Sequence, residues 1–109
     1  MKIYYHVTLK SNLKSILEKG LYPQIGTLSE LCNETEERIY LFPSIEDMEN
    51  ALGNWLGEEI NKLYGEDIDC CSLKITLPDN FPIVKGDVDY ECYSYHHIDK
   101  KYITYLKDE

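Results

Sequence analysis

Residues 71–77 alternate strictly between apolar and polar side chains, and this pattern constrains the fold more than any other stretch of the chain. A period of two is typical of a strand that buries one face and exposes the other. A second alternating strand is expected over residues 3–7. A third, over residues 39–42, is apolar on both faces and is therefore expected at the centre of a sheet.

Two helices are expected between these strands. The first covers about residues 10–19, and Gly20 follows where a left-handed C-terminal cap belongs. The second begins after Ser44, an N-cap residue with Asp47 three positions later in a capping box. Its apolar stripe recurs with helical spacing through residues 45–63.

The C-terminal third predicts a meander of short strands at residues 83–84, 90–95 and 102–106. The order β-α-loop-β-α-β-β-β indicates an α+β fold. The 109 residues are expected to form a single domain, residues 1–109, because this length suffices for a core without metal or disulfide staples.

The charge balance argues against two classes of partner. The chain has 20 acidic and 11 basic residues, a formal charge of −9, and Arg38 is its only arginine. Binding to nucleic acid needs lysines and arginines aligned along the phosphates. An anionic membrane surface repels an acidic protein. We therefore expect a protein or small-molecule partner rather than nucleic acid, and no membrane.

The cysteines indicate a reduced compartment. They are Cys32, Cys70, Cys71 and Cys92. Their spacing does not match the disulfide framework of a small secreted domain. No apolar signal-peptide core follows Met1, and no apolar run approaches the ~18 residues of a membrane span. A cytoplasmic protein with free, mostly buried thiols is expected.

A zinc site could be formed by Cys70, Cys71 and Cys92 together with His96 and His97. Neighbouring residues of a strand point to opposite faces, so Cys70 and Cys71 cannot easily share one ion. Core thiols and surface histidines explain the cluster better, and no metal is expected.

Two polar side chains on predicted strands are candidates for chemistry. His6 shares a face with Tyr4 and Thr8; it is either a partly buried histidine bonded to backbone or a fixed donor for a ribose hydroxyl or an amide. Glu91 shares a face with Tyr93; it is either solvent-facing or a carboxylate in a tyrosine-lined cleft that orients a hydroxyl or accepts a proton. Ten tyrosines in so small a domain favour a partly wet cleft.

Short motifs in three segments follow one another in a defined order. They are Tyr5-His6-Val7-Thr8 with a helix closing at Gly20-Leu21, the block 39–44 running into a helix, and Tyr90-Glu91 with Ile98 and residues 101–103 after it. Together they resemble ADP-ribosyltransferase-like domains, in particular small bacterial and phage-type members distantly related to RNA 2′-phosphotransferases and DNA-modifying ADP-ribosylating toxins. The resemblance implies a twisted or split antiparallel-rich sheet with two main helices.

The resemblance also implies NAD as substrate, with ADP-ribose transferred to an unknown acceptor or NAD cleaved. The cofactor-binding candidates are His6, Thr8, Tyr40 and Ser44, and the catalytic candidate is Glu91. His6 would bond the adenosine ribose and Thr8 would support the nicotinamide ribose. The aromatic near the nicotinamide is Tyr40 or another ring such as Trp55. Glu91 would bond the ribose 2′-hydroxyl and stabilise the oxocarbenium.

The chain departs from the family pattern at several points. Val7 stands where many members have glycine, and a single arginine argues against the phosphotransferase branch. The pyrophosphate would rely on Lys10, Lys14, Arg38 or backbone donors. Loop 21–38, long for a compact domain, would lie over the cofactor as a lid or acceptor-recognition element.

Two non-enzymatic alternatives stay open. One is a catalytically inactive acidic binding or inhibitor protein that covers a basic partner surface, with the carboxylates of residues 34–37, 46–49 and 58–59 merged into one face. The other is a ligand-binding module with the same cleft and no chemistry.

Overall fold

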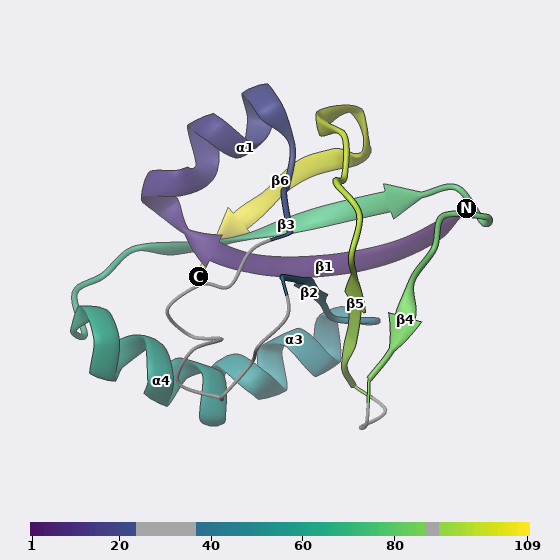
Figure 1. Cartoon of the computed structure of the whole chain (residues 1–109). Coiled ribbons are helices and arrows are strands. Elements are labelled where there is room, and N and C mark those ends of the chain that lie inside the picture. The colour runs from purple at the N-terminus through teal and green to yellow at the C-terminus, as the bar shows by residue number, and fades with distance from the viewer. Residues whose placement is uncertain (24–36, 87–89) are drawn as a thin grey trace.

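A computed structural model describes residues 1–23, 37–86 and 90–109 (Figure 1). Its elements are β1 (Lys2–Leu9), the 3₁₀ helix η1 (Lys10–Asn12), α1 (Leu13–Lys19), β2 (Ile39–Leu41), α3 (Ile45–Leu52), α4 (Trp55–Tyr64), β3 (Cys70–Leu77), β4 (Val84–Lys85), β5 (Cys92–Ser94), η2 (Lys100–Tyr102) and β6 (Ile103–Asp108). The predicted α+β class is confirmed. The central part of loop 21–38, with Cys32 and most of the acidic run 34–37, lies outside the described residues.

The strands form two antiparallel sheets, ordered β1-β3-β6 and β2-β5-β4. β1 pairs with β3 over its whole length, from Lys2 opposite Leu77 to Leu9 opposite Cys70. In the described part of the chain the two sheets meet at a bridge, where Tyr5 N–H donates to the Phe42 carbonyl (2.9 Å) and Phe42 N–H donates to the Tyr5 carbonyl (2.7 Å). Figure 1 shows β4 and β5 running across the direction of β1 beyond this junction.

The three strands predicted for the C-terminal third are present, but the prediction that the last one continues a meander is wrong. β4 pairs with β5, but β6 pairs with β3, so the chain crosses from one sheet to the other after β5. Ile98, fully buried, guides the crossing because it exchanges two backbone hydrogen bonds of 2.9 Å with Leu21. Ile103 then lies opposite Ile75 and completes the core, which a strand beside β5 would not do.

The sheet separates two apolar clusters. The cluster on the α1 side comprises Ile16, Leu21, Ile39, Leu41, Leu73, Ile75, Leu77, Cys92, Ile98 and Ile103. The cluster under α3 and α4 comprises Phe42, Met48, Ala51, Leu56, Ile60 and Cys70. Tyr4 packs on the first cluster and Tyr5 on the second, so β1 alternates as predicted and carries Tyr4, His6 and Thr8 toward the α1 side.

The end of α1 and the start of α3 lie at their predicted cap residues, whereas the start of α1 does not. Gly20 ends α1 with φ of 86°, as expected, although residues 10–12 of the predicted helix form a 3₁₀ turn. At the start of α3 the Asp47 N–H donates to the Ser44 hydroxyl at 3.0 Å, which confirms the N-cap.

The helix predicted over residues 45–63 is two helices, so the described chain has three α-helices rather than two. α3 ends at Leu52, the chain turns at Gly53, and α4 begins at Trp55. A Cβ atom at Gly57 would lie 2.0 Å from the Leu52 carbonyl oxygen. The two helices can therefore approach this closely only because residue 57 has no side chain.

We expect Gly57→Ala to destabilise the fold by about 1–3 kcal/mol, because the added methyl group must displace backbone. Gly53→Ala is the matched control: its φ is −75° and its Cβ would lie 3.4 Å from the Glu49 carbonyl oxygen, so we expect a change within about 1 kcal/mol. Urea unfolding followed by circular dichroism measures both. Equal unfolding midpoints for the two variants would contradict the close approach.

Candidate functional site

An open pocket of about 380 Å³ lies where the two sheets meet. Its lining residues are Lys2 and Tyr4 from β1, Pro43 after β2, Phe81 and Ile83 before β4, Lys85 from β4, and Glu91 and Cys92 at β5. The lining residues thus combine one acidic residue, one tyrosine and two lysines with apolar residues.

Glu91 is positioned by its contacts with Gly86. Its carbonyl accepts a hydrogen bond from Gly86 N–H at 2.9 Å. A Cβ atom on Gly86 would lie 3.0–3.1 Å from the Cβ, Cγ and Cδ atoms of Glu91. The Glu91 side chain therefore packs directly on the glycine backbone, a contact that a larger residue at position 86 would obstruct.

The neighbouring thiol is not a nucleophile. Burial, and then the negative charge of Glu91, raise the pKa of Cys92 to about 11. Its Sγ–H donates to the Leu41 carbonyl at 3.2 Å. Since the thiolate is the reactive form, Cys92 serves packing rather than covalent chemistry at neutral pH.

His6 is held by backbone. Its Nδ1–H donates to the Tyr40 carbonyl at 2.7 Å, and because a carbonyl only accepts, Nδ1 carries the proton. Burial lowers the pKa of His6, although the bond to Tyr40 opposes this shift. The neutral ring therefore presents Nε2 as a hydrogen-bond acceptor. His6 would accept a hydrogen bond from a ribose hydroxyl, whereas the sequence analysis expected it to donate one.

The side chain of Tyr40 lies on the other face. Its neighbours Ile39 and Leu41 belong to the α1-side cluster, so alternation turns the Tyr40 phenol away from His6. There its ring lies 6.1 Å from the Tyr93 ring, and Arg38 Nη1 donates to its hydroxyl at 3.4 Å. Arg38 also stacks on Tyr93, with 4.4 Å from the guanidinium carbon to the ring centroid.

Thr8 and Ser44 are not among the residues that line the pocket. Thr8 is four residues beyond Tyr4 on β1, about 13 Å along the strand. The Ser44 hydroxyl accepts from Asp47 N–H and donates to Asp47 Oδ2 at 2.9 Å, so the helix cap engages it. Of the five predicted site residues, the described pocket lining includes Glu91 alone.

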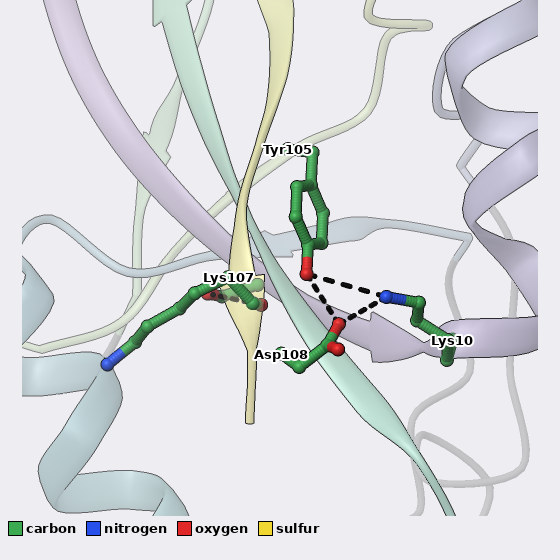
Figure 2. Close-up of polar contacts among 5 residues, drawn as sticks. Lys10, Tyr105, Lys107 and Asp108 are labelled. Carbon is green, nitrogen blue, oxygen red and sulfur yellow. Dashed lines mark hydrogen bonds and ion pairs between the residues drawn. The ribbon is translucent and has the colours of Figure 1, made fainter.

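Lys10, a predicted pyrophosphate contact, is engaged elsewhere (Figure 2). Its ammonium forms an ion pair with Asp108 and donates to the Tyr105 hydroxyl at 3.4 Å, while that hydroxyl donates to Asp108 at 2.5 Å. The hydrogen bond to Asp108 raises the pKa of Lys10. This cluster fastens β6 to the end of β1 opposite Lys2, about 25 Å from the pocket end of the strand.

The residues weighed for zinc are dispersed. Cys70 belongs to the cluster under α3 and α4, Cys92 to the α1-side cluster, and His97 bonds the Lys19 carbonyl through Nε2–H at 2.9 Å. Within the described ranges, no group of three or more His, Cys, Asp or Glu residues could hold a metal ion. Cys70, Cys71 and Cys92 are free and buried, as predicted.

Sequence reasoning missed most of the pocket lining. Lys2 and Lys85 carry no motif and resemble ordinary solubilising lysines at strand ends. Tyr4 was recognised only as a neighbour of His6, although its place on the same face of β1 was a usable signal.

No family model, curated protein or solved structure matches this chain. In the part of the chain that the structure describes, no helix has the length and apolar character needed to cross a membrane.

The burial of His6 gives a testable prediction about its pKa. Its folded-state pKa lies below the unfolded value of about 6.5, so the unfolded chain binds the proton more tightly. The stability from this group is therefore fully present above pH 6.5 and is lost as pH falls through the folded pKa. We expect a proton NMR titration, with His6→Gln to assign the resonance, to give a midpoint below 6.5. A midpoint at or above 6.5 would contradict a buried neutral ring.

Proposed function

We propose that this protein binds NAD in the pocket beside Glu91 and transfers its ADP-ribose group to an acceptor. The observation that carries the proposal is the juxtaposition of Glu91 and Tyr4 in one open pocket at the junction of two sheets. His6 lies two residues from Tyr4 on the same face of β1, about 7 Å along the strand. The order of motifs that resembles ADP-ribosyltransferase-like domains, and the division of the strands into two joined sheets, support the same conclusion.

The reaction needs little more than a placed carboxylate. The bond between the ribose C1′ and the nicotinamide nitrogen breaks, and its electron pair leaves with nicotinamide. Positive charge then develops on the ribose ring, where the Glu91 carboxylate stabilises it. A nucleophilic atom of the acceptor forms the new bond to C1′ and gives up its proton; with water in that role the products are ADP-ribose and nicotinamide.

Two lysines offset the unfavourable overall charge at this place. The chain carries a formal charge of −9, which repels the pyrophosphate of NAD. Lys2 and Lys85 both line the pocket and both have exposed ammonium-bearing side chains. Lys2 can contact phosphate oxygens, whereas Lys10 is paired with Asp108 at the far end of β1 and Arg38 lies beside Tyr40 and Tyr93.

A second candidate function rests on the helix pair. Trp55 is 45% exposed at the start of α4, and Ile45 is exposed at the start of α3. Exposed carboxylates of Glu46 and Glu58 accompany them. An exposed tryptophan with acidic neighbours fits a surface that covers a basic partner. An acidic binding protein of this kind would show neither NAD binding nor nicotinamide release.

We expect Glu91→Gln to lower the rate of nicotinamide release by about 10²–10³-fold, because the amide cannot stabilise the developing charge. The assay incubates the protein with NAD labelled in the adenosine half and measures both released nicotinamide and label transferred to acceptors.

Glu66→Gln is the matched control, because Glu66 is an exposed carboxylate in the turn after α4. We expect it to behave as the wild type. An unchanged rate in Glu91→Gln, or a wild type without NAD binding, nicotinamide release and label transfer, would contradict the proposed enzymatic function.

A further inference from the structure

We propose that the outer surface of the α3–α4 helix pair is a docking surface for a lysine- or arginine-rich protein partner, with Trp55 as its apolar anchor. The proposal rests on the second candidate function and names the chemistry of the partner and of the contact. It is independent of NAD chemistry, because neither helix contributes a residue to the pocket lining.

Trp55 is presented from a fixed backbone. It is the only tryptophan of the chain, and it is 45% exposed at the first position of α4. The next residue, Leu56, is buried in the cluster under α3 and α4. The close approach of Gly57 to the Leu52 carbonyl holds the start of α4 against the end of α3. A large ring on an anchored backbone loses little freedom on binding, which is why tryptophan is enriched at the centres of protein interfaces.

The segment that contains the helix pair carries most of the negative charge. Residues 45–69 contain eight acidic residues and one lysine, so they contribute −7 of the formal charge of −9. The lysine, Lys62, lies 3.6 Å from Glu59 in an ion pair. Among the described residues, no ion pair neutralises Glu46 or Glu58, which are both exposed. Glu58 follows Trp55 by three positions, so the two side chains are neighbours on the surface of α4.

The opposite side of the β1-β3-β6 sheet carries the opposite charge. α1 lies on that side, away from α3 and α4 (Figure 1). Residues 1–23, which form β1 and α1, contain four lysines and one glutamate. Like charges gathered on one helix pair repel one another and oppose folding. A cationic partner would relieve that repulsion on binding.

Charge complementarity therefore identifies the occupant. The helix pair repels phosphates and acidic surfaces, whereas it attracts lysine and arginine side chains and speeds their approach. A lysine or arginine side chain also binds favourably over the face of an indole ring. An exposed tryptophan contributes most when apolar groups of the partner exclude water around it. The partner that fits is a protein surface with cationic side chains around a small apolar contact.

The experiment titrates the protein with two synthetic peptides of equal charge, one of alternating lysine and leucine and one of lysine alone. Because Trp55 is the only tryptophan, a blue shift of the tryptophan fluorescence reports contact at this surface. We expect the lysine–leucine peptide to bind more tightly than oligolysine and to cause the blue shift. We expect its binding to weaken by about 10-fold or more between low and high salt, because salt screens the attraction.

Two variants locate the contact, and each has a matched control on α1. We expect Trp55→Ala to raise the Kd for the lysine–leucine peptide about 10-fold or more, and Glu58→Gln to raise it about 2- to 5-fold. Isothermal titration calorimetry measures the Kd, and thermal unfolding verifies that each variant is folded. The controls are Leu17→Ala, at an exposed apolar side chain, and Glu18→Gln, at an exposed carboxylate. Both should stay within about 2-fold of the wild type, because distant sites act independently.

The outcomes separate this inference from the function on which it rests. If the wild type binds the lysine–leucine peptide but Trp55→Ala and Glu58→Gln bind it equally well, the docking surface is overturned and the second candidate function stands. If neither peptide binds at low salt, both are overturned. A wild-type dimer in analytical ultracentrifugation that Trp55→Ala abolishes would identify a second copy as the occupant and overturn the proposed partner.

Discussion

Two backbone hydrogen bonds between Tyr5 and Phe42 hold the two sheets together, and the geometry around the pocket depends on them. The bridge sets the register of β2 beside β1, which brings the Tyr40 carbonyl to the His6 ring and fixes its tautomer. The next residue, Pro43, has no N–H to continue the ladder. The sheets therefore separate at this point, and Pro43 becomes part of the wall of the pocket that opens there.

The chemistry available in the pocket depends on which of its ionisable groups are charged at neutral pH and which are neutral. The thiol of Cys92 stays protonated, since burial and the adjacent carboxylate both raise its pKa. The phenol of Tyr4 stays protonated for the same main reason. Among the described lining residues, Glu91, Lys2 and Lys85 are the ones with ionisable acidic or basic side chains besides these two groups. An acidic chain can bind an anionic ligand because such local charges act at short range, where the distant field is screened.

Period-two patterns predicted the positions of the strands well but not their places in the sheets. β3 is the central strand of its sheet and buries Ser72 on the face expected to be exposed, whereas β2, expected at a sheet centre, lies at the edge of its sheet. The break in the predicted helix 45–63 was not predictable from its apolar stripe, because both segments keep helical spacing and bury the same side under the sheet. The partner of the last strand was not predictable either. Alternation fixes which residues are buried but says nothing about which neighbour covers an edge, and Ile103 is equally apolar beside β3 or β5.

The same limit explains what was and was not foreseen at the site. Glu91 was predictable because it is a carboxylate among strand residues. Which tyrosines lie near it depends on the strand register, which the sequence does not show. Along β2 and β5, alternation sends Tyr40 and Tyr93 to one face, where they enclose Arg38, while Tyr4 on β1 faces the other. The tyrosines therefore serve several environments: Tyr40 and Tyr93 pack with Arg38 on the small sheet, Tyr4 packs on the α1-side cluster, and Tyr105 joins Lys10 and Asp108. Because a shift of one residue exchanges the two faces of a strand, a motif can identify the right strand region without fixing the face on which its side chains lie.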